Sequence, residues 1–454
     1  MNDPLLSISS IDGRYHEKTK ILNKYFSEFA LIRKRIIVEI EYLKFLALKK
    51  IIPKISKREL KILDDIQLKF NLNEAKKVKK IEDKINHDVK AVELYLRNTF
   101  KSKKLSKLSS FIHIGLTSSD TNNIAVSLSF KDCKNEIIKF KLNEILISLK
   151  KLSLKYKSNS IMGRTHGQPA VPTTFGKEVA NYYFRIKKLE EKVKSFVFEG
   201  KLNGAVGSYN ALFFVYPKIN WIKFSREFLR KLKLKENLYT TQILPYDNLI
   251  EYFQIIKNIN NILIGLSIDL WFYYMLGVIS LEKGKEQVGS STMPQKINPI
   301  ELENAEGNLS CANALFSFYE QKLSYSRLQR DLSDSTIIRT FGTSIAHTII
   351  GWSSILKGLS YLKFNKEKAE NELNVHWEVL AEAIQTYLRT KGDNKAFEKV
   401  KNLVYGKKIN KDDFQKITSL IKNKKDRKLI SALKPKDYIG LASKLTSDII
   451  KKSK

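Results

Sequence analysis

The sequence predicts an all-α protein built around a bundle of long helices. Three observations carry this prediction. Apolar residues recur at helical spacing over long stretches, alternating β-branched runs are few and short, and only nine prolines interrupt 454 residues. Hydrophobic residues make up 43% and charged residues 28% of the chain, the balance of a soluble globular protein. A chain of this length exceeds what one core supports, so two or three domains are expected.

The first part of the chain, residues 1–110, is expected to form an N-terminal helical domain. Two short polar segments interrupt its helical pattern, "SSIDGRY" (9–15) and "INHDVKA" (85–91). Glycine, aspartate and asparagine favour turns over helix interiors. Both segments are therefore expected to be loops.

Residues 111–361 are expected to form a central domain of long helices. The clearest helix follows Pro172, with Thr173 or Thr174 as its N-cap and Gly200 as its stop. Its apolar residues recur in alternating steps of four and three, the pattern of a bundle helix. These residues are Phe175, Val179, Tyr182, Ile186, Leu189, Val193 and Phe196. Helical patterns on the same length scale cover 121–157, 246–280 and 333–361, which together imply a bundle.

Polar, glycine-bearing segments separate these helices and are expected to be loops. They are "GLTSSDTNN" (115–123), "GRTHGQPAVP" (163–172), "KLNGAVGSYN" (201–210) and "GSSTMPQKINPIELENAEGN" (289–308), in which a helix resumes at "IELENAEGN". Residues 362–454 show shorter helical patterns and lysine-rich turns, and we expect a C-terminal small helical domain there. The apolar stretch 262–280 is nearly long enough to span a bilayer, but it carries Asp269 in its middle. A fully buried helix is the favoured interpretation.

The net charge of +34 allows two interpretations. A strongly basic surface supplies affinity for phosphates, so the chain could bind nucleic acid. Alternatively, the lysines are spread over solvated surfaces, since they are scattered along the whole chain and form no stripe interleaved with aromatic residues. We favour the second interpretation. The positive field could still attract an anionic substrate.

Cysteine content and the N-terminus bear on the compartment. Cys133 and Cys311 are the only cysteines and lie far apart, which excludes a disulfide framework and fits a reducing compartment. The N-terminus has no basic segment followed by an apolar one, so no signal peptide is predicted. A cytoplasmic, soluble protein is expected.

His166 is a candidate proton donor or acceptor, because it lies in "GRTHGQPA" beside small and polar residues at the entrance to a long helix. A neutral imidazole near its own pKa can give or take a proton. A structural role is the competing interpretation. The local composition favours the chemical role.

The segment 289–308 has the composition of a closing loop. Gly289 supplies a hinge, and Ser290, Ser291, Lys296 and Asn298 concentrate hydrogen-bonding groups and one cation. Serine acts as a base only where an ammonium and backbone amides stabilise its alkoxide. Lys296 could supply that charge or could bind a substrate carboxylate. An ordinary connecting loop is the alternative.

Arginines cluster in "SRLQRDLSDSTIIRT" (326–340), although most basic residues of the chain are lysines. The guanidinium group suits bidentate binding of phosphate. If this segment is helical, Ser335 and Arg339 share a face. Arg14, in "DGRY", is another arginine in a glycine-bearing loop. Ion pairs with Asp331 and Asp334 on a solvated face are the alternative.

Motifs for metals and nucleotide cofactors are absent. The sequence contains no HExxH, EF-hand loop, GxGxxG or GxxxxGK[ST]. No metal site and no cofactor are predicted.

Taken together, these segments resemble the fumarase/aspartase superfamily, whose signature is a GSxxMPxKxNP loop. Here the loop reads "GSSTMPQKINP" from Gly289 to Pro299. The resemblance implies a mostly helical, three-domain fold whose long central helices form a twenty-helix core in a homotetramer. It also implies release of fumarate by β-elimination without a redox cofactor or catalytic metal, at active sites to which three subunits contribute.

Within the superfamily, the chain is similar to the branch that cleaves succinylated purine nucleotides, in its long bacterial form. "GRTHGQPA" has glycine after histidine, where fumarases and aspartases usually have leucine. Further matches follow in order: "DGRY", "NHDVKA", "TSSDTNN", "NGAVGSYN", "TTQ" (240–242), "RDLSDSTIIR" (330–339) and "HWEVLAE" (376–382). The similarity implies small-molecule nucleotide substrates, with neither nucleic acid nor membrane as partner.

The resemblance assigns roles to individual residues. Ser290 matches the general base, His166 the general acid, and Glu303 the carboxylate that orients this histidine. Lys296 and Asn298 match groups that stabilise the substrate carboxylate as negative charge spreads into it. The nucleotide phosphate and ribose are matched by Arg14, Tyr15, Arg330, Ser335 and Arg339. Other substrate contacts are matched by Asn86, His87, Asp88, Thr117, Ser118, Gln242, Ser291 and Asn304.

One position departs from the pattern, and two other functions remain as alternatives. Many relatives have histidine where this chain has Gln295. We therefore expect Gln295→His to change turnover, measured as kcat, by less than about tenfold. A larger change would show that this residue takes part in catalysis. A different fumarate-releasing lyase, such as one cleaving argininosuccinate, is the first alternative. A nucleic-acid-binding helical protein is the second, and salt-dependent DNA retention without elimination activity would favour it.

Overall fold

The computed structural model describes residues 3–282, 293 and 295–452 and confirms an all-α chain with a few short strands. The described residues pack as two units. Unit 1 comprises residues 1–141, 190–260 and 308–351, and unit 2 comprises 142–189, 261–307 and 352–454. The expected domains 1–110, 111–361 and 362–454 stay a prediction.

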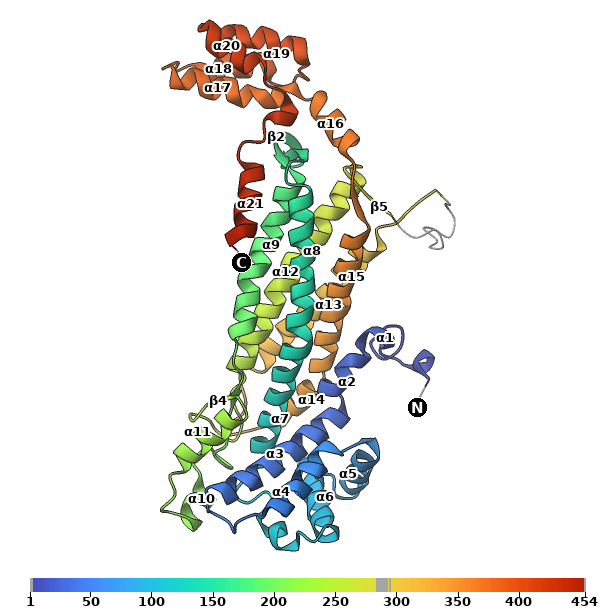
Figure 1. Ribbon diagram of the computed structural model, residues 1–454, viewed down its shortest axis with the longest axis vertical. Coiled ribbons are helices and arrows are strands. Elements are labelled where there is room, and N and C mark those ends of the chain that lie inside the picture. The colour runs from blue at the N-terminus through green and yellow to red at the C-terminus, as the bar shows by residue number, and fades with distance from the viewer. Residues whose placement is uncertain (1–2, 283–292, 294, 453–454) are drawn as a thin grey trace. The chain divides into compact units, whose positions relative to one another are not determined.

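The long helices belong in part to each unit. They are α8 (Lys139–Lys155), α9 (Phe175–Ser195), α12 (Asp247–Met275), α13 (Ile300–Lys322) and α15 (Phe341–Tyr361). Within unit 2, α9 contacts α12 through Tyr182 and Asp269, and α13 contacts α15 through Asn304 and Ser354. Their unit 2 portions therefore run side by side, as Figure 1 shows.

The described part of unit 1 adds further helices and one small sheet. The helices are α1 (His16–Thr19), α2 (Asn23–Phe26), α3 (Glu28–Leu48), α4 (Lys57–Leu68), α5 (Leu72–Ile85), α6 (Asp88–Ser102), α7 (Ser118–Cys133), α10 (Asn210–Val215), α11 (Trp221–Lys231) and α14 (Ser333–Ile338). The strands β3 (Glu199–Gly200) and β4 (Lys235–Glu236) pair in parallel. An aromatic core holds the unit together, with Phe253 in ring contact with Phe130, Phe316, Tyr319 and Phe341.

The described residues of unit 2 form two antiparallel sheets and a group of small helices. The strands are β1 (Ser160–Thr165), β2 (Gln168–Thr174), β5 (Ile279–Leu281) and β6 (Leu362–Phe364), paired as β1–β2 and β5–β6. The helices are α16 (Lys366–Asn374), α17 (Ala381–Thr390), α18 (Ala396–Val404), α19 (Lys411–Ile417), α20 (Lys424–Ser431) and α21 (Ala442–Lys452). Figure 1 shows α17 to α20 gathered together, and Trp377, Leu380, Ile384 and Phe414 lie in their common core.

The helix expected after Pro172 is confirmed as α9. All seven apolar residues of its predicted stripe are buried: six of them lie on one face of the helix, and Phe196 directly follows it. The helix ends at Ser195, before Gly200. The patterns at 121–157 and 246–280 correspond to α7 followed by α8, joined by a π turn at Lys134–Ile138, and to α12.

Three expectations about local structure are wrong. Residues 163–172 form most of the β1–β2 hairpin instead of a loop. The segments 85–91 and 115–123 are only partly loops, because α6 begins at Asp88 and α7 begins at Ser118. The apolar stretch 262–280 is not fully buried, since α12 exposes Trp271, Phe272 and Met275.

Membrane crossing finds no support in the part of the chain that the structure describes. None of its helices combines the length and apolar character that a bilayer span requires.

Candidate active site

Seven of the predicted substrate-binding residues line one pocket in unit 1. This polar pocket has a volume of about 960 Å³, which includes space open to solvent. The predicted residues in its wall are Asn86, His87, Asp88, Ser118, Arg330, Ser335 and Arg339. They come from the α5–α6 junction, the start of α7 and the region of α14, which are far apart in the sequence.

The α5–α6 junction presents three of these residues through helix capping. Asn86 ends α5 in the left-handed conformation, with a φ of 51°, which asparagine tolerates better than most residues. His87 is the N-cap of α6, and its Nδ1 accepts a hydrogen bond from the Lys90 amide at 3.1 Å. A neutral His87 ring therefore carries its proton on Nε2. Asp88 begins α6, where the helix dipole favours a carboxylate.

Asp88 is held by an arginine that the sequence analysis missed. Arg35 of α3, 2% exposed, donates from Nη2 to Asp88 at 2.5 Å and from Nε to Asn122 at 2.8 Å. Burial alone would raise the pKa of Asp88, but the charge of Arg35, the Val89 amide and Arg339 hold this pKa below its ordinary value. The sequence signal was present, because Arg35 interrupts the apolar stripe of α3 beside Ile32 and Ile36.

The α14 region places the predicted phosphate-binding residues. Ser335 and Arg339 share a face, as expected, since Arg339 Nη1 donates to the Ser335 hydroxyl at 2.8 Å and to its carbonyl at 2.7 Å. Arg339 also lies 3.8 Å from Asp88. Arg330 donates to the Gln242 side chain at 3.2 Å, which brings Gln242 to the edge of the pocket. The guanidinium groups can receive an anion here, because Asp88 is already neutralised by buried Arg35.

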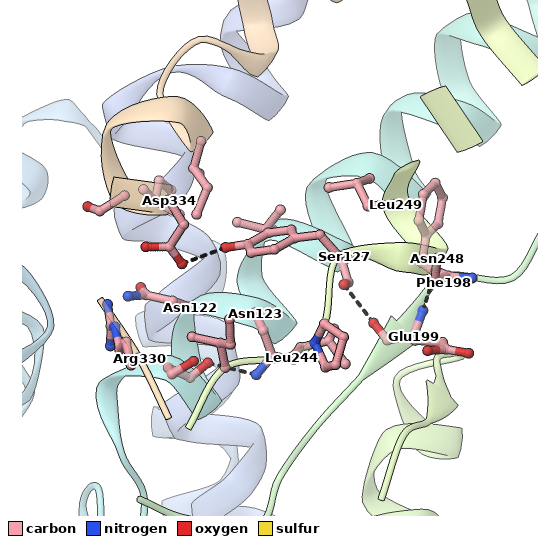
Figure 2. A pocket seen from close by; sticks show the side chains of 18 of the residues that line it. Asn122, Asn123, Ser127, Phe198, Glu199, Leu244, Asn248, Leu249, Arg330 and Asp334 are labelled. Carbon is pink, nitrogen blue, oxygen red and sulfur yellow. Dashed lines mark hydrogen bonds between the residues drawn. The ribbon is translucent and has the colours of Figure 1, made fainter. Parts of the chain in front are cut away.

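A second, more apolar pocket shares a wall with the polar one. This inner pocket has a volume of about 800 Å³, which includes space open to solvent. Figure 2 shows Asp334, Asn122 and Arg330 near one another on one side of it. Asn248 and Glu199 lie on the other side. The two pockets share Asp88, Asn122, Arg330, Ser335 and Arg339. Tyr246 donates to Asp334 at 2.8 Å, and burial together with this carboxylate raises the pKa of Tyr246.

The remaining predicted residues of unit 1 lie outside the wall of the polar pocket. Thr117 precedes α7, and its amide donates to Asp120 at 2.9 Å. Arg14 is exposed, and Tyr15 is the N-cap residue of α1 with Lys18 over its ring at 5.7 Å. The structure therefore does not bring Arg14 and Tyr15 to the polar pocket within the described chain.

In unit 2, part of the signature loop lines a separate hollow of about 950 Å³, open solvent included, which we call the loop pocket. It contains Lys296, Asn298 and Glu303 together with Gln295, Trp271 and Tyr274. Trp271 Nε1 donates to the Glu303 carboxylate at 3.3 Å, and Tyr274 donates to the Ile297 carbonyl. Asn304, one residue further along α13, accepts a hydrogen bond from Ser354 at 2.8 Å. Ser290 and Ser291 lie outside the described residues.

His166 lies elsewhere in unit 2, at the turn of the β1–β2 hairpin. His166 and Gly167 have φ values of 53° and 74°, the positive pair that a two-residue hairpin turn requires. The side chain is exposed and makes no hydrogen bond with another described residue. The predicted pairing of His166 with Glu303 is not seen among the described residues of a single chain, where Glu303 instead accepts from Trp271.

Known proteins resemble this chain over nearly its whole length. Residues 13–315 match the family described as lyase, and residues 326–439 match the family described as adenylosuccinate lyase C-terminal. The chain is 42% identical to the adenylosuccinate lyase of Legionella pneumophila (strain Corby), over 97% of this chain and 98% of the relative. Identity is 44% to that of Buchnera aphidicola subsp. Schizaphis graminum and 38% to that of Escherichia coli (strain K12), each over 98% of this chain and 99% of the relative.

Solved structures share the fold. The fumarate lyase from Mesorhizobium sp. BNC1 aligns with a TM-score of 0.75 at 16% identity, over 95% of this chain and 97% of that one. The 3-carboxy-cis,cis-muconate lactonizing enzyme from Pseudomonas putida also has a TM-score of 0.75, at 15% identity, over 96% and 97% of the two chains. At these identities the likeness concerns the fold alone, and it agrees with the all-α architecture.

Proposed function

This chain belongs to the adenylosuccinate lyase family of the fumarase/aspartase superfamily, and from this premise we propose that it eliminates fumarate from adenylosuccinate to leave AMP. It also cleaves the succinylated aminoimidazole carboxamide ribotide of purine biosynthesis by the same elimination. Cleavage of argininosuccinate is not favoured, because that molecule carries no phosphate for the arginines of the α14 region.

The proposed chemistry divides between two residues. Ser290, as alkoxide, takes a proton from the carbon next to a succinyl carboxylate, the electron pair forms the double bond of fumarate, and the carbon–nitrogen bond breaks. His166 gives its proton to the departing nitrogen. Negative charge that spreads into the carboxylate is stabilised by Lys296 and Asn298. Glu303 orients His166, and no step needs a cofactor.

The observation that carries the proposal is the polar pocket of unit 1. Arg330, Ser335 and Arg339 provide the donors that a phosphate requires, and Asn86, His87 and Ser118 add polar groups for the rest of a nucleotide. Family membership makes adenylosuccinate the nucleotide to test first.

We further propose a homotetramer whose active sites are shared between subunits. The separation of His166 from Glu303 within unit 2 supports sharing, because two residues of one catalytic group belong to different elements without contact in one chain. Exposed apolar side chains on α12 and α13, such as Phe272 and Phe318, support burial in an assembly. A cytoplasmic location is part of the same proposal and is supported by two cysteines that form no disulfide.

The test is fumarate release by the purified protein, with adenylosuccinate and argininosuccinate offered separately. We expect fumarate and AMP from adenylosuccinate only. Ser290→Ala and His166→Ala should each fold normally and lose elimination, while Ser280→Ala, the same change at an exposed position of strand β5, should retain it. Wild-type activity in either site variant would remove that residue from its role.

Mixing tests the shared site. When the Ser290→Ala and His166→Ala proteins are dissociated and reassembled together, mixed tetramers contain sites with both residues intact, so activity should return. No recovery from mixed tetramers would place both residues in one chain's site.

A further inference from the structure

A fully buried ion pair lies in unit 1 beyond the polar pocket. The Lys201 ammonium is 3.1 Å from an Asp120 carboxylate oxygen, and both side chains are 0% exposed. Burial lowers the pKa of Lys201, Asp120 opposes this effect, and Arg330 adds to it. Neither residue lines a pocket described above, so neither can touch a substrate there.

Apart from the contact between them, the two charged groups form their hydrogen bonds with backbone groups of three segments. Besides Asp120, the Lys201 ammonium donates to the carbonyls of Gly204 at 3.0 Å and Gln242 at 2.6 Å. The Asp120 carboxylate accepts from the amides of Asn203 at 3.1 Å, Gly204 at 3.1 Å and Thr117 at 2.9 Å. Three donors of an ammonium and both oxygens of a carboxylate are thereby satisfied.

Two of the three segments, the start of α7 and the loop before α12, carry predicted substrate contacts. Thr117 precedes α7 and Ser118 begins it, and Gln242 follows Thr241 in the loop before α12. The loop 201–210 lies between them: the Asn203 side chain donates to Thr240 at 2.8 Å, and the Gln242 side chain donates to the Ala205 carbonyl at 3.1 Å. Gln242 in turn accepts from Arg330 at 3.2 Å. One ion pair therefore connects the start of α7, the loop 201–210 and the partner of a pocket arginine.

We infer that Lys201 and Asp120 are positioning residues for the nucleotide site, holding Thr117, Ser118 and Gln242 in binding geometry. This inference rests on the proposed function, because it takes those three residues as substrate contacts. A buried ion pair contributes little net stability relative to an apolar pair, since desolvation offsets the attraction. Its hydrogen bonds instead fix direction, because each backbone group must point at one charge.

The test compares Lys201→Met with Lys134→Met in the full-length enzyme. Lys134 is a matched control, because it is 5% exposed, lies in the same unit and donates to a backbone carbonyl, that of Phe196, but lines neither the polar nor the inner pocket. Both changes should lower the melting temperature. Kinetics with adenylosuccinate are then measured at a temperature where circular dichroism shows every variant folded.

We expect Lys201→Met to raise KM about tenfold, because a rise of this size corresponds to the loss of one to two hydrogen bonds to the substrate. The value of kcat should change less than about threefold. Lys134→Met should leave both constants near wild type. Asp120→Asn, which keeps one acceptor oxygen, should raise KM in the same direction, and it replaces Lys201→Met if that variant does not fold.

Each other outcome has one meaning. A folded Lys201→Met or Asp120→Asn with wild-type KM overturns the positioning role, as does an equal rise of KM in Lys134→Met. A wild-type protein that releases no fumarate contradicts the proposed function instead, and is recognised before any variant is compared.

Discussion

The Arg339 side chain is held in one orientation by contacts within its own chain, without a ligand. Its guanidinium donates twice to Ser335 and faces Asp88, so part of the entropy of fixing this long side chain is already lost. Its planar group then offers its remaining N–H donors to a phosphate.

Arg339→Lys should therefore weaken substrate binding, because lysine presents a point charge in place of a planar pair of donors. We expect KM for adenylosuccinate to rise about tenfold, the loss of a charged hydrogen bond. Steady-state kinetics check this, with Arg327→Lys as the control, since Arg327 is 82% exposed and pairs loosely with Asp331 at 3.9 Å. Equal effects in both variants would contradict a specific phosphate contact.

The residues that sequence reasoning missed are buried charges. Arg35 and Lys201 lie among 81 lysines and arginines, so composition hides them. Lys201 and Asp120 are 81 positions apart, and no local pattern joins them. Individual candidate residues could be predicted from motifs, but the contacts that hold them depend on tertiary packing.

At the scale of elements, long helices were predicted well and the hairpin was not. Helix α9 is 21 residues long and its a/d pattern is sustained along it, which makes the helical signal strong. The hairpin β1–β2 contains Gly163, Gly167, Pro169 and Pro172, which read as a loop. Its two strands pair only with each other and a bulge lies between Met162 and Arg164, so glycine and proline are tolerated there.

The loop 201–210 must fit closely against the segment 240–242. Gly207 has a φ of 82°, and an added Cβ would come within 2.2 Å of the Thr240 carbonyl. Gly207→Ala should displace Thr240 and Gln242, lowering kcat/KM about tenfold or more.

Gly392→Ala is the control for this prediction, because Gly392 has a φ of 84° but open space around its Cβ position. It carries the same backbone strain, about 1 kcal/mol, without the clash. Its kcat/KM should match wild type at a temperature where both variants are folded. Similar losses in the two variants would mean that strain alone is responsible.

His113 joins the segment before α7 to α3. Its Nδ1 lies 2.7 Å from the Glu39 carboxylate. Burial lowers the pKa of His113, but the hydrogen bond and charge of Glu39 outweigh it and raise this pKa above 6.5. The charged His113–Glu39 pair therefore stabilises the fold fully at pH values below the pKa that His113 has in the unfolded chain. This stabilisation is lost as the pH rises through the pKa of His113 in the folded protein.

The stability gap between wild type and His113→Gln should narrow as pH rises above 6.5, because only the wild type loses a charged partner of Glu39. Urea denaturation at a series of pH values measures the gap. A gap that is constant or widens with pH would show that His113 stays neutral beside Glu39.

For the whole molecule, the net charge of +34 should act on substrate encounter. Adenylosuccinate is an anion, and a positive field raises its local concentration. Raising sodium chloride from about 0.01 M to 0.15 M shortens the screening length from about 30 to 8 Å, so kcat/KM should fall several-fold while kcat stays constant. Sucrose at matched osmolality is the control, and a parallel fall of kcat would contradict steering.

The order of the chain through the two units has a consequence for synthesis. Each passage from one unit to the other occurs inside a long helix, namely α8, α9, α12, α13 or α15. Unit 1 lacks its last stretch until residue 351 has left the ribosome, and unit 2 needs the C-terminal segment. Unit 2 therefore cannot complete its core while translation is in progress, and unit 1 can do so only late, so nascent chains should depend on chaperones for much of their synthesis.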